Sequence, residues 1–472
     1  MSVLTLRNSQ AKRRVRGVKA RRRTELGLLV FASLIIIAAY TLMVLGNTSK
    51  LPSDSIPLLV LMFVLGAAAH IANRIFAPNA NAAILPIAFL LNGIGYMMIV
   101  RLDLYPRHET HYAPLQATWT AVGVGAYIAT LIVVRRSRDL DRYRYLLLVA
   151  GVGLLLAPLV PHLGANINGA RLWVHVGSLE FQPVELAKIV LCIFFASYFA
   201  EKRELLTIPT ARFGNRLVVD PRPLVPIVLA WVFAIGVMSL EHDIGFSALL
   251  FTLFIALLWV TTGRTGYLVL GVVLFGIGAY ISSHYFAQTH IRVETWLDPW
   301  KIIPPNDPGY QLRQAWYSLG SGGIGGTGLG LGSPGLIPNA NTDFIFAGIA
   351  EEMGLFGSTM VVVAFLLIVG AGLRAAQSAK SEFSKLTATG LTVIIGFQAF
   401  FIIGGVVRLL PLTGITLPFV SYGGSALIAN YILIALLMRI SDEGATTADA
   451  DEKEQFEKTE AARRALLAGP RG

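Results

Sequence analysis

The sequence predicts an all-α polytopic membrane protein with about 12 transmembrane helices and one large loop on the outer side of the membrane. The chain has 472 residues, of which 54% are hydrophobic and 14% are charged, whereas soluble proteins carry about 25% charged residues. Its mean hydropathy is +0.63. Apolar runs of about 20 residues, the length of a membrane-spanning helix, recur along the chain. These observations favour one membrane domain over the roughly three soluble domains that the length alone would predict.

Twelve segments are apolar and long enough for a spanning helix, which needs about 20 mostly apolar residues. They cover residues 25–46, 56–77, 82–101, 116–134, 145–161, 183–200, 223–240, 243–262, 266–284, 344–373, 386–407 and 421–440. The fifth segment is short for a span, and the seventh and eighth nearly join through "LEHD".

The distribution of Lys and Arg predicts the orientation of these helices. With a cytoplasmic N-terminus, about 30 of the 39 Lys and Arg lie in cytoplasmic segments and about 8 lie outside, as the positive-inside rule requires. Residues 1–24 are then a basic cytoplasmic tail, because a signal peptide has a shorter charged region and a cleavage site. Residues 441–472 form a cytoplasmic C-terminal tail, and the 285–342 loop lies outside.

Composition and motifs exclude several classes of function. The net charge is +11, but the basic residues lie in short blocks between apolar runs, so no nucleic acid is expected as a partner. The single cysteine, Cys192, can form neither an intrachain disulfide nor a Cys-based zinc site. The chain has no GxxxxGK[ST] motif. Chemistry on the outer side must therefore use energy already in the substrate, or a gradient.

Charged residues inside the predicted spans are functional candidates, because a charge in the bilayer is costly. In "VELAKIV", Glu185 and Lys188 are three residues apart and share a helix face. They form either an ion pair that only joins helices or a cation beside an outer polar pocket. Asp243 opens the eighth span, where capping is the ordinary role of an aspartate. The adjacent acids Glu351 and Glu352 lie in the tenth span.

The outer loop carries a second group of candidates. Asp298 and Asp307 each precede a proline, and such pairs are turn signals as well as possible sites of a reactive acid. The run "GSGGIGGTGLGLGS" at 320–333 follows no β-strand of a βαβ unit. It therefore predicts tight turns and close approach to a ligand rather than a dinucleotide site. Asp343 stands at a helix start, where capping is again the default.

The 410–424 segment carries two prolines and a pair of glycines at a span boundary. Broken backbone at membrane depth is tolerated only where protein or a cavity covers it. The segment is therefore predicted to form the floor or wall of a site. Ser421 and Ser425 have no His–Asp partners nearby in sequence, so no serine-hydrolase role is assigned to them.

Five stretches resemble the motifs of the SEDS family (shape, elongation, division and sporulation), the group of RodA, FtsW and SpoVE. They are "NGARLWVHVGSLEFQPVELAK" (168–188), "DIGFSALL" (243–250), "LDPWKIIPPNDPGYQLRQAWYSLGSGGIGGTGLGLGS" (297–333), "NTDFIFAGIAEEMGLFG" (341–357) and "LPLTGITLPFVSYGGSALIANY" (410–431). They run in family order within residues 82–440, and the last is the most specific. The resemblance implies a ten-helix SEDS core at 82–440 preceded by two extra transmembrane helices at 25–77.

The resemblance also implies a function. SEDS proteins are peptidoglycan glycosyltransferases of the bacterial cytoplasmic membrane. They polymerise lipid II, the undecaprenyl-diphosphate-linked disaccharide-pentapeptide, into glycan strands at the outer membrane face, for cell elongation or division. They work with a class B penicillin-binding protein, which crosslinks the strands, and with other cell-wall assembly proteins. The short C-terminal tail favours the RodA branch of the family.

The family's key acid corresponds to Asp307, in the Asp-Pro before Gly-Tyr-Gln, and Asp298 ranks second. A base must take the proton of an attacking sugar hydroxyl, and a partly desolvated site would raise the pKa of an aspartate for that task. The diphosphate leaving group needs cations or a divalent metal, Mg²⁺ or Mn²⁺, and no other cofactor is expected. The residues implied to bind the substrate are Lys188, Glu185, Arg171, Arg101, Asp298, Gln311, Asp343 and Ser421.

The sequence departs from the family pattern at two positions, and two other functions remain as alternatives. Asn341 stands where relatives usually have His, and His242 where Pro is common, so no ligand or base role is placed at residue 341. A flippase for the lipid-linked precursor would also use an intramembrane charged pair and a broken segment. A non-catalytic scaffold for cell-wall assembly would depend only on its partner contacts.

Overall fold

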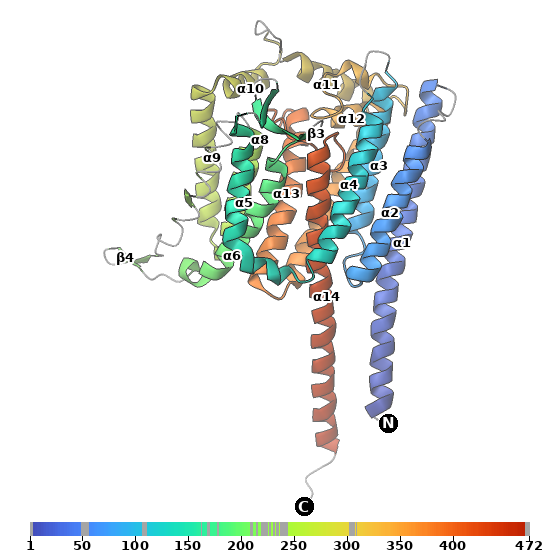
Figure 1. Cartoon of the computed structure of the whole chain (residues 1–472), viewed down its shortest axis with the longest axis vertical. Helices are drawn as coiled ribbons and strands as arrows, with labels where there is room; N and C mark the ends of the chain where they lie inside the picture. The colour runs from blue at the N-terminus through green and yellow to red at the C-terminus, as the bar shows by residue number, and fades with distance from the viewer. Residues whose placement is uncertain are drawn as a thin grey trace, which may run out of the picture.

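A computed structural model shows a bundle of long helices with both termini at the same end (Figure 1). It describes residues 3–48, 56–105, 111–161, 163–167, 170–176, 179–207, 211–213, 216–218, 225, 228–229, 232, 236, 244–301, 307 and 309–467. Asp243 and nearly all of the seventh predicted span, 223–240, lie outside the described residues.

Helices make up most of the described chain and the strands are few and short, which confirms the all-α prediction. The α-helices are α1 (Val3–Thr48), α2 (Ile56–Phe76), α3 (Ile84–Asp103), α4 (Tyr112–Val133), α5 (Arg144–Leu156), α6 (Val184–Thr207), α8 (Ile244–Thr262), α9 (Thr265–Tyr285), α10 (Ala287–Leu297), α11 (Gly309–Gly322), α12 (Ile345–Ser378), α13 (Glu382–Val406) and α14 (Gly424–Leu467). The 3-10 turns are η1 (Ser137–Tyr143), η2 (Ala157–Leu159) and η4 (Pro334–Leu336). Strands β1 (Gly164–Ile167), β2 (Ala170–Val176) and β3 (Leu179–Phe181) form an antiparallel sheet in that order, and β4 (Ala211–Phe213) pairs with β5 (Arg216–Val218).

Ten helical segments of the described chain are long and apolar enough to cross a membrane. They coincide with ten of the twelve predicted spans. The predicted span at 183–200 is the helix α6, which packs on α5, α8 and α13. Because α6 carries Glu185 and Lys188 near its start and "EKRE" at 201–204, it is not among the ten.

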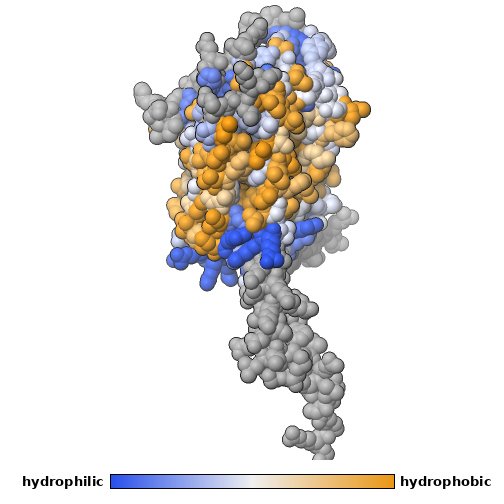
Figure 2. All heavy atoms as spheres, turned by 90° about the vertical axis from the view of Figure 1, so that its right-hand side faces the viewer, coloured by the Kyte–Doolittle hydropathy of each residue, from blue (hydrophilic) through white to orange (hydrophobic). Residues whose placement is uncertain are grey.

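The helices differ in how deeply they are buried. The apolar stretches of α3, α13 and α14 are 89%, 72% and 83% buried, against 6% for α9, which stands at the edge of the bundle in Figure 1. In the space-filling view of Figure 2, apolar side chains form a broad band between two polar ends. Such a band is what a protein that crosses a bilayer presents to lipid.

The two ends of the bundle carry different structures (Figure 1). We call the end with both termini the tail end, and the opposite end, with β3, α10 and α11, the loop end. The predicted outer loop at 285–342 is not irregular throughout, because it contains α10 and α11. Both helices are amphipathic: in α11 the buried Leu312, Ala315 and Ser318 share one face, which packs against α12.

The first two helices form an added layer against the rest of the bundle. Small residues allow the close packing: a Cβ on Gly93 of α3 would lie 2.2 Å from Ile36 of α1, and one on Gly66 of α2 would lie 2.6 Å from Phe89 of α3. A buried polar network adds to it. Glu25 of α1 lies 2.7 Å from the ring Nδ1 of His70 on α2, so the two helices are also joined by a charged or polar contact.

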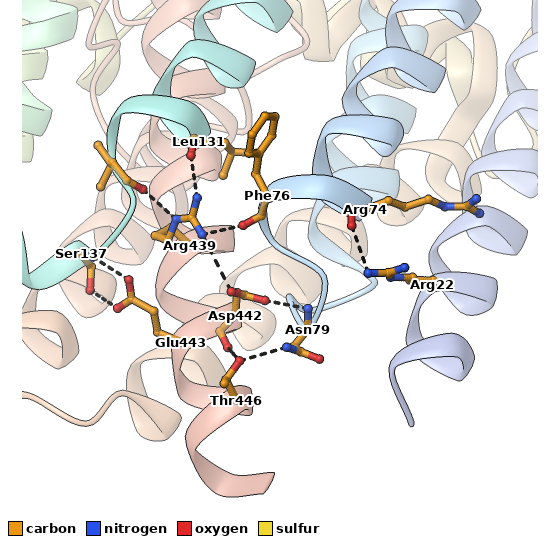
Figure 3. Close-up of polar contacts among 11 residues, drawn as sticks. Arg22, Arg74, Phe76, Asn79, Leu131, Ser137, Arg439, Asp442, Glu443 and Thr446 are labelled. Atoms are coloured by element: carbon orange, nitrogen blue, oxygen red, sulfur yellow. Dashed lines mark hydrogen bonds and ion pairs between the residues drawn. The ribbon is translucent and has the colours of Figure 1, made fainter. Parts of the chain in front are cut away.

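At the tail end, one arginine binds backbone carbonyl groups at the C-terminal ends of two helices. Arg439 of α14 donates to the carbonyl oxygens of Phe76 at 2.6 Å, of Leu131 at 2.6 Å and of Val134 at 2.7 Å (Figure 3). These carbonyls belong to the C-terminal ends of α2 and α4, where the last turns have no intrahelical donors. A cation there also complements the helix dipoles.

The next turns of α14 bind the connections that follow those two helices. The carboxylate of Asp442 accepts the backbone N–H of Asn79 at 2.7 Å, and the Asn79 side chain donates to Thr446 at 3.0 Å. Glu443 accepts the backbone N–H of Ser137 at 2.7 Å and its hydroxyl at 2.5 Å (Figure 3). We call residues 439, 442, 443 and 446 with these partners the tail-end hub.

Candidate functional site

Asp307, the predicted catalytic acid, lies just before α11 and pairs with a residue of that helix. Its carboxylate accepts from Nη1 of Arg313 at 3.3 Å and forms an ion pair with Nη2. Nη1 also donates to the carbonyl oxygen of Pro299 at 2.6 Å, so the guanidinium joins both ends of the 299–307 segment. The hydrogen bond to Asp307 raises the pKa of Arg313. Because the Asp307 side chain is 27% exposed, the carboxylate is held in place yet open to a ligand.

A cavity of about 220 Å³ lies between α10, α11 and the chain after α13. Its lining residues are Gln288, Ile291, Arg292, Thr295 and Trp296 of α10, Gln311 and Leu312 of α11, Asp343 and Phe344 before α12, and Leu410, Leu412 and Gly414. Two predicted substrate-binding residues, Gln311 and Asp343, therefore meet in one cavity. The start of the 410–424 segment forms part of the cavity wall, and that this wall belongs to a functional site stays a prediction.

The two helices over the cavity are fastened to the end of α13. Trp296 of α10 donates from Nε1 to the carbonyl oxygen of Arg408 at 3.0 Å, and the Arg408 guanidinium donates back to the carbonyl oxygens of Trp296 at 3.1 Å and Leu297 at 2.7 Å. Trp316 of α11 donates to Val406 at 3.1 Å, and its ring lies 5.2 Å from the Arg408 guanidinium. These contacts fix the cavity walls relative to the bundle.

Asp343 contributes a carboxyl group to the cavity rather than a helix cap. The N-cap of α12 is Phe344, and no side chain caps that helix, so the expected capping role of Asp343 is wrong. Burial raises the pKa of the Asp343 carboxyl to about 6, although the positive charge of Arg292 and a hydrogen bond with Thr342 oppose the shift. Arg292 is itself held by Thr413, whose carbonyl oxygen accepts from Nη1 at 2.8 Å.

Glu185 and Lys188 form the ion pair that their spacing predicts. The Lys188 ammonium lies 2.5 Å from the Glu185 carboxylate, and both side chains are fully buried. The ammonium also donates to Gln398 of α13 at 2.8 Å, and Gln398 donates to the carbonyl oxygen of Thr416 at 2.9 Å. The pair thus links α6 to α13 and to the broken 410–424 segment. Its role as a substrate-binding site stays a prediction.

Arg101 lies in a second buried ion pair, which holds the glycine-rich loop. Its Nε donates to Glu352 of α12 at 2.8 Å, and its Nη2 donates to the carbonyl oxygen of Gly332 at 2.7 Å. Glu352 also accepts the backbone N–H of Gly330 at 2.9 Å. Glu351 accepts the backbone N–H of Ser333, at the end of the same loop, at 2.8 Å. The two adjacent acids therefore receive the backbone donors of the tight turns.

The other predicted site residues lie in separate places. Ser421 accepts the N–H of Leu417 at 3.0 Å and donates to the carbonyl oxygen of Thr342 at 2.7 Å, so it ties the 417–421 turn to the chain before α12. Asp298 is exposed and accepts the N–H of Trp300 at 3.2 Å at the end of α10. Arg171 lies on β2, and its side chain is outside the described residues. Substrate contact by these three residues stays a prediction.

Several residues that build this region were missed by reasoning from sequence. Arg313, Arg292 and Thr295 were not among the predicted site residues, although the first pairs with Asp307 and the other two line the cavity. One signal was available for α10: Gln288, Ile291, Arg292 and Thr295 have the three-and-four spacing of one helix face. Nothing in the sequence shows that this face covers a cavity.

A divalent cation finds no ready-made cage of side chains in the described part of the chain. There, no three His, Cys, Asp or Glu residues gather closely enough to hold a metal ion. The two candidate acids of the outer loop already have other partners. Asp307 pairs with Arg313, and Asp298 accepts a backbone N–H in a turn. Side chains alone therefore do not fit a metal site among these residues.

Comparisons with known proteins identify the relatives of this chain. The FtsW/RodA/SpoVE family model, described as "Cell cycle protein", matches residues 81–446. The chain is 40% identical over 426 residues to the peptidoglycan glycosyltransferase RodA of Mycobacterium tuberculosis (strain ATCC 25618 / H37Rv), which covers 89% of this chain and 90% of that protein. It is 35% identical over 292 residues to the probable peptidoglycan glycosyltransferase FtsW of Geobacter sp. (strain M18), covering 61% and 76%.

Two solved structures share the fold. The crystal structure of the rod shape determining protein RodA of Thermus thermophilus superposes with a TM-score of 0.54 at 23% identity, over 77% of this chain and 96% of that chain. A chain from the study "Structural coordination of polymerization and crosslinking by a peptidoglycan synthase complex" gives a TM-score of 0.53 at 23% identity, over 82% and 97%. Together with the motif order and the family match over most of its length, this places the chain in the FtsW/RodA/SpoVE family.

Proposed function

We propose that this protein is a peptidoglycan glycosyltransferase that polymerises lipid II into glycan strands at the outer face of the bacterial cytoplasmic membrane. The observation that carries the proposal is Asp307. It stands in the motif-matched region, is held by Arg313 at the loop end, and lies four residues before Gln311, which lines the cavity. Relatives named as peptidoglycan glycosyltransferases at 40% and 35% identity support it.

In this reaction a sugar hydroxyl attacks the anomeric carbon of a second, lipid-linked sugar. The bond from that carbon to the diphosphate oxygen breaks, and the lipid diphosphate leaves as an anion. Asp307 takes the hydroxyl proton as the new glycosidic bond forms. Arg313 fixes the direction of the carboxylate through a charge-assisted, two-point contact. The diphosphate bond supplies the driving force, so the reaction requires no ATP.

The leaving diphosphate must find positive charge at the loop end. Lys188 and Arg101 are each paired with a buried glutamate, so a diphosphate would compete with a carboxylate for either of them. A divalent cation, Mg²⁺ or Mn²⁺, would supply the missing charge by arriving with the diphosphate, since Mg²⁺ often binds through substrate phosphates and few side chains.

The setting of the enzyme belongs to the same proposal. The surplus of Lys and Arg in the tail-end segments supports cytoplasmic termini and an outward-facing loop end. A class B penicillin-binding protein is the proposed partner. One structural neighbour belongs to a peptidoglycan synthase complex that coordinates polymerization and crosslinking, which supports a crosslinking partner of this kind.

The proposal is tested with purified protein, with and without its partner, on labelled lipid II. Asp307→Asn should lower the rate of glycan polymer formation at least about 100-fold, in the range of a lost general base, while membrane insertion and partner binding persist. Glu294→Gln is the matched control, because Glu294 forms ion pairs in the same region with two exposed residues, Lys301 and His290, and such pairs contribute little. Polymer made by Asp307→Asn at the wild-type rate would refute the catalytic assignment.

Transport of the lipid-linked precursor is the second candidate function. The fully buried Glu185–Lys188 pair beside the broken 410–424 segment favours it, because transporters place charged groups and unwound backbone together near the bilayer midplane. Vesicles with labelled lipid II separate the two functions. Protein-dependent exposure of lipid II from the inner leaflet, without polymer, would support transport and contradict the polymerase.

A further inference from the structure

We propose that the cavity between α10, α11 and residues 410–414 binds one uncharged sugar ring of the glycan strand. The inference rests on the proposed function and adds to it a subsite that is separate from Asp307. Its residues are on α10, on the first turn of α11, at Asp343–Phe344 and on the 410–414 segment. Four features support it: an unpaired hydroxyl, two free amides, a balanced charge and the size of the space.

The first feature is a buried hydroxyl without a partner. Thr295 is only 4% exposed, and its Oγ1 has no hydrogen-bond partner among the described residues. Leaving such a group unpaired costs about 1–3 kcal/mol, and a ligand that pairs with the hydroxyl would recover this free energy. Thr295 lines the cavity, where a ligand hydroxyl or amide would satisfy it.

The second feature is a pair of side-chain amides on facing helices. Gln288 of α10 and Gln311 of α11 both line the cavity, and neither amide forms a hydrogen bond within the described part of the chain. Each amide offers two N–H donors and one carbonyl acceptor. Mixed donors and acceptors suit sugar hydroxyls and acetamido groups, which both donate and accept.

The third feature is the charge, which favours a neutral ligand. Arg292 and Asp343 line the same cavity, and their charges act on each other. An anion near Arg292 would also meet the Asp343 carboxylate, and Arg292 already donates to the Thr413 carbonyl oxygen. A diphosphate therefore gains little binding free energy in this cavity. A neutral polar ring, by contrast, can use the arginine as a hydrogen-bond donor and the aspartate as an acceptor.

The fourth feature is the size and shape of the space. The volume of about 220 Å³ is below the roughly 300–1,000 Å³ of sites for drug-sized ligands, so it suits one ring rather than a disaccharide. Trp296, which is half-buried, supplies apolar aromatic surface against which the C–H face of a sugar can pack. Since Gln311 follows Asp307 by only four residues, the inference assigns the bound ring to the strand on which Asp307 acts.

The test uses Thr295→Val, which keeps the shape of the side chain and removes only the hydroxyl. Thr289→Val is the matched control, because Thr289 lies on the same helix, is 6% exposed, and its hydroxyl lies 3.1 Å from that of Ser282, away from the cavity lining. Full-length protein in lipid nanodiscs is titrated with chitotetraose, an uncharged lipid-free probe, and separately with inorganic diphosphate. Binding is followed by saturation-transfer NMR.

Thr295→Val should weaken chitotetraose binding about fivefold, the effect of one lost hydrogen bond, and shorten the glycan strands made from lipid II. It should also raise thermal stability without ligand, since it removes an unpaired hydroxyl. Thr289→Val should lower stability and leave binding unchanged. If Thr295 had only a structural role, its substitution would not raise the stability of the protein while weakening its affinity for the sugar.

Two results would overturn the inference. One is wild-type chitotetraose affinity and strand length in Thr295→Val. The other is diphosphate binding that Thr295→Val weakens as much as it weakens sugar binding, which would make the cavity an anion site. Repeating the sugar titration on Asp307→Asn separates this inference from the polymerase proposal, because the probe needs no catalysis to bind. Sugar binding without polymer formation by the wild type would refute the polymerase proposal alone.

Discussion

At the scale of single residues, the acids at the loop end lie in three different environments. Asp307 has a guanidinium partner on α11, and Glu352 has both Arg101 and a backbone N–H. Asp343 shares a cavity with Arg292, yet burial outweighs that charge. The three environments suit different tasks: a fixed proton acceptor, a structural clamp, and a group that titrates near neutral pH.

The titration of Asp343 predicts a pH-dependent stability. Its pKa is about 6 in the folded protein against an ordinary value of 3.8, so between these values the folded chain retains a proton that the unfolded chain has lost. Its contribution to stability is therefore greatest at low pH and falls as pH rises through this window. Asp343→Asn should remove the decline. Its melting temperature relative to wild type should then be higher at about pH 7 than at about pH 4.

Thermal unfolding of both proteins in detergent across this pH range measures the difference. A constant gap between the two melting temperatures would show that the Asp343 carboxyl titrates normally.

The same residue shows the limit of reasoning from sequence. Its position at a helix start predicted capping, but the chain turns so that Phe344 is the N-cap. Likewise, the partner of Asp307 was not predictable, because residues 307 and 313 do not have the spacing of a helix pair.

At the scale of elements, the glycine-rich loop is packed between α12 and the end of α1. Gly326, Gly328 and Gly330 adopt positive φ angles, which only glycine accepts without strain. A Cβ on Gly46 of α1 would lie 2.3 Å from the carbonyl oxygen of Leu329. The loop and the added helix therefore touch backbone to backbone. The prediction of tight turns in this run is confirmed.

This contact predicts that α1 supports the loop end. Gly46→Val should destabilise the protein by roughly 1–3 kcal/mol, the range for overpacking a close contact, and should lower polymer formation because the loop moves. Gly27→Val on the same helix is the control, since a Cβ there meets nothing within 4 Å. Thermal unfolding and the lipid II assay measure both effects. Equal stability of the two variants would contradict the contact.

Sequence patterns located the long elements well and the short ones poorly. Eleven predicted spans coincide with helices, counting α6, because hydropathy over about 20 residues is a strong signal. By contrast, α10 and α11 have 11 and 14 residues, and their apolar faces are interrupted by polar residues that line the cavity. The β1–β3 sheet was also not predicted, since its strands are only 4, 7 and 3 residues long.

At the scale of the whole molecule, the tail-end hub joins segments that are far apart in sequence. Arg439 binds three carbonyl oxygens from α2 and from the end of α4. Arg439→Gln should destabilise the protein by about 3 kcal/mol, because hydrogen bonds to a charged group contribute about 1.5–3 kcal/mol each and Gln retains part of them. Arg374→Gln, at an exposed position of α12, should have almost no effect. Detergent-based thermal unfolding compares them.

A loss in Arg439→Gln no larger than in Arg374→Gln would mean that the hub does not hold the helices together. The hub could not be predicted from sequence, because Arg439 resembles any other basic residue at the end of a span. Which carbonyls it reaches depends on how α2, α4 and α14 pack, and that packing is set by apolar side chains whose neighbours the sequence does not specify.

The added pair α1 and α2 has a steric consequence for assembly. It covers the flank of α3 and α4. Ile36 of α1 packs against Gly93 of α3, and Phe89 of α3 packs against Gly66 of α2. A membrane anchor of another subunit cannot occupy that flank without displacing the pair. Lateral docking of such an anchor is thus limited to the sides of the bundle that these two helices leave uncovered.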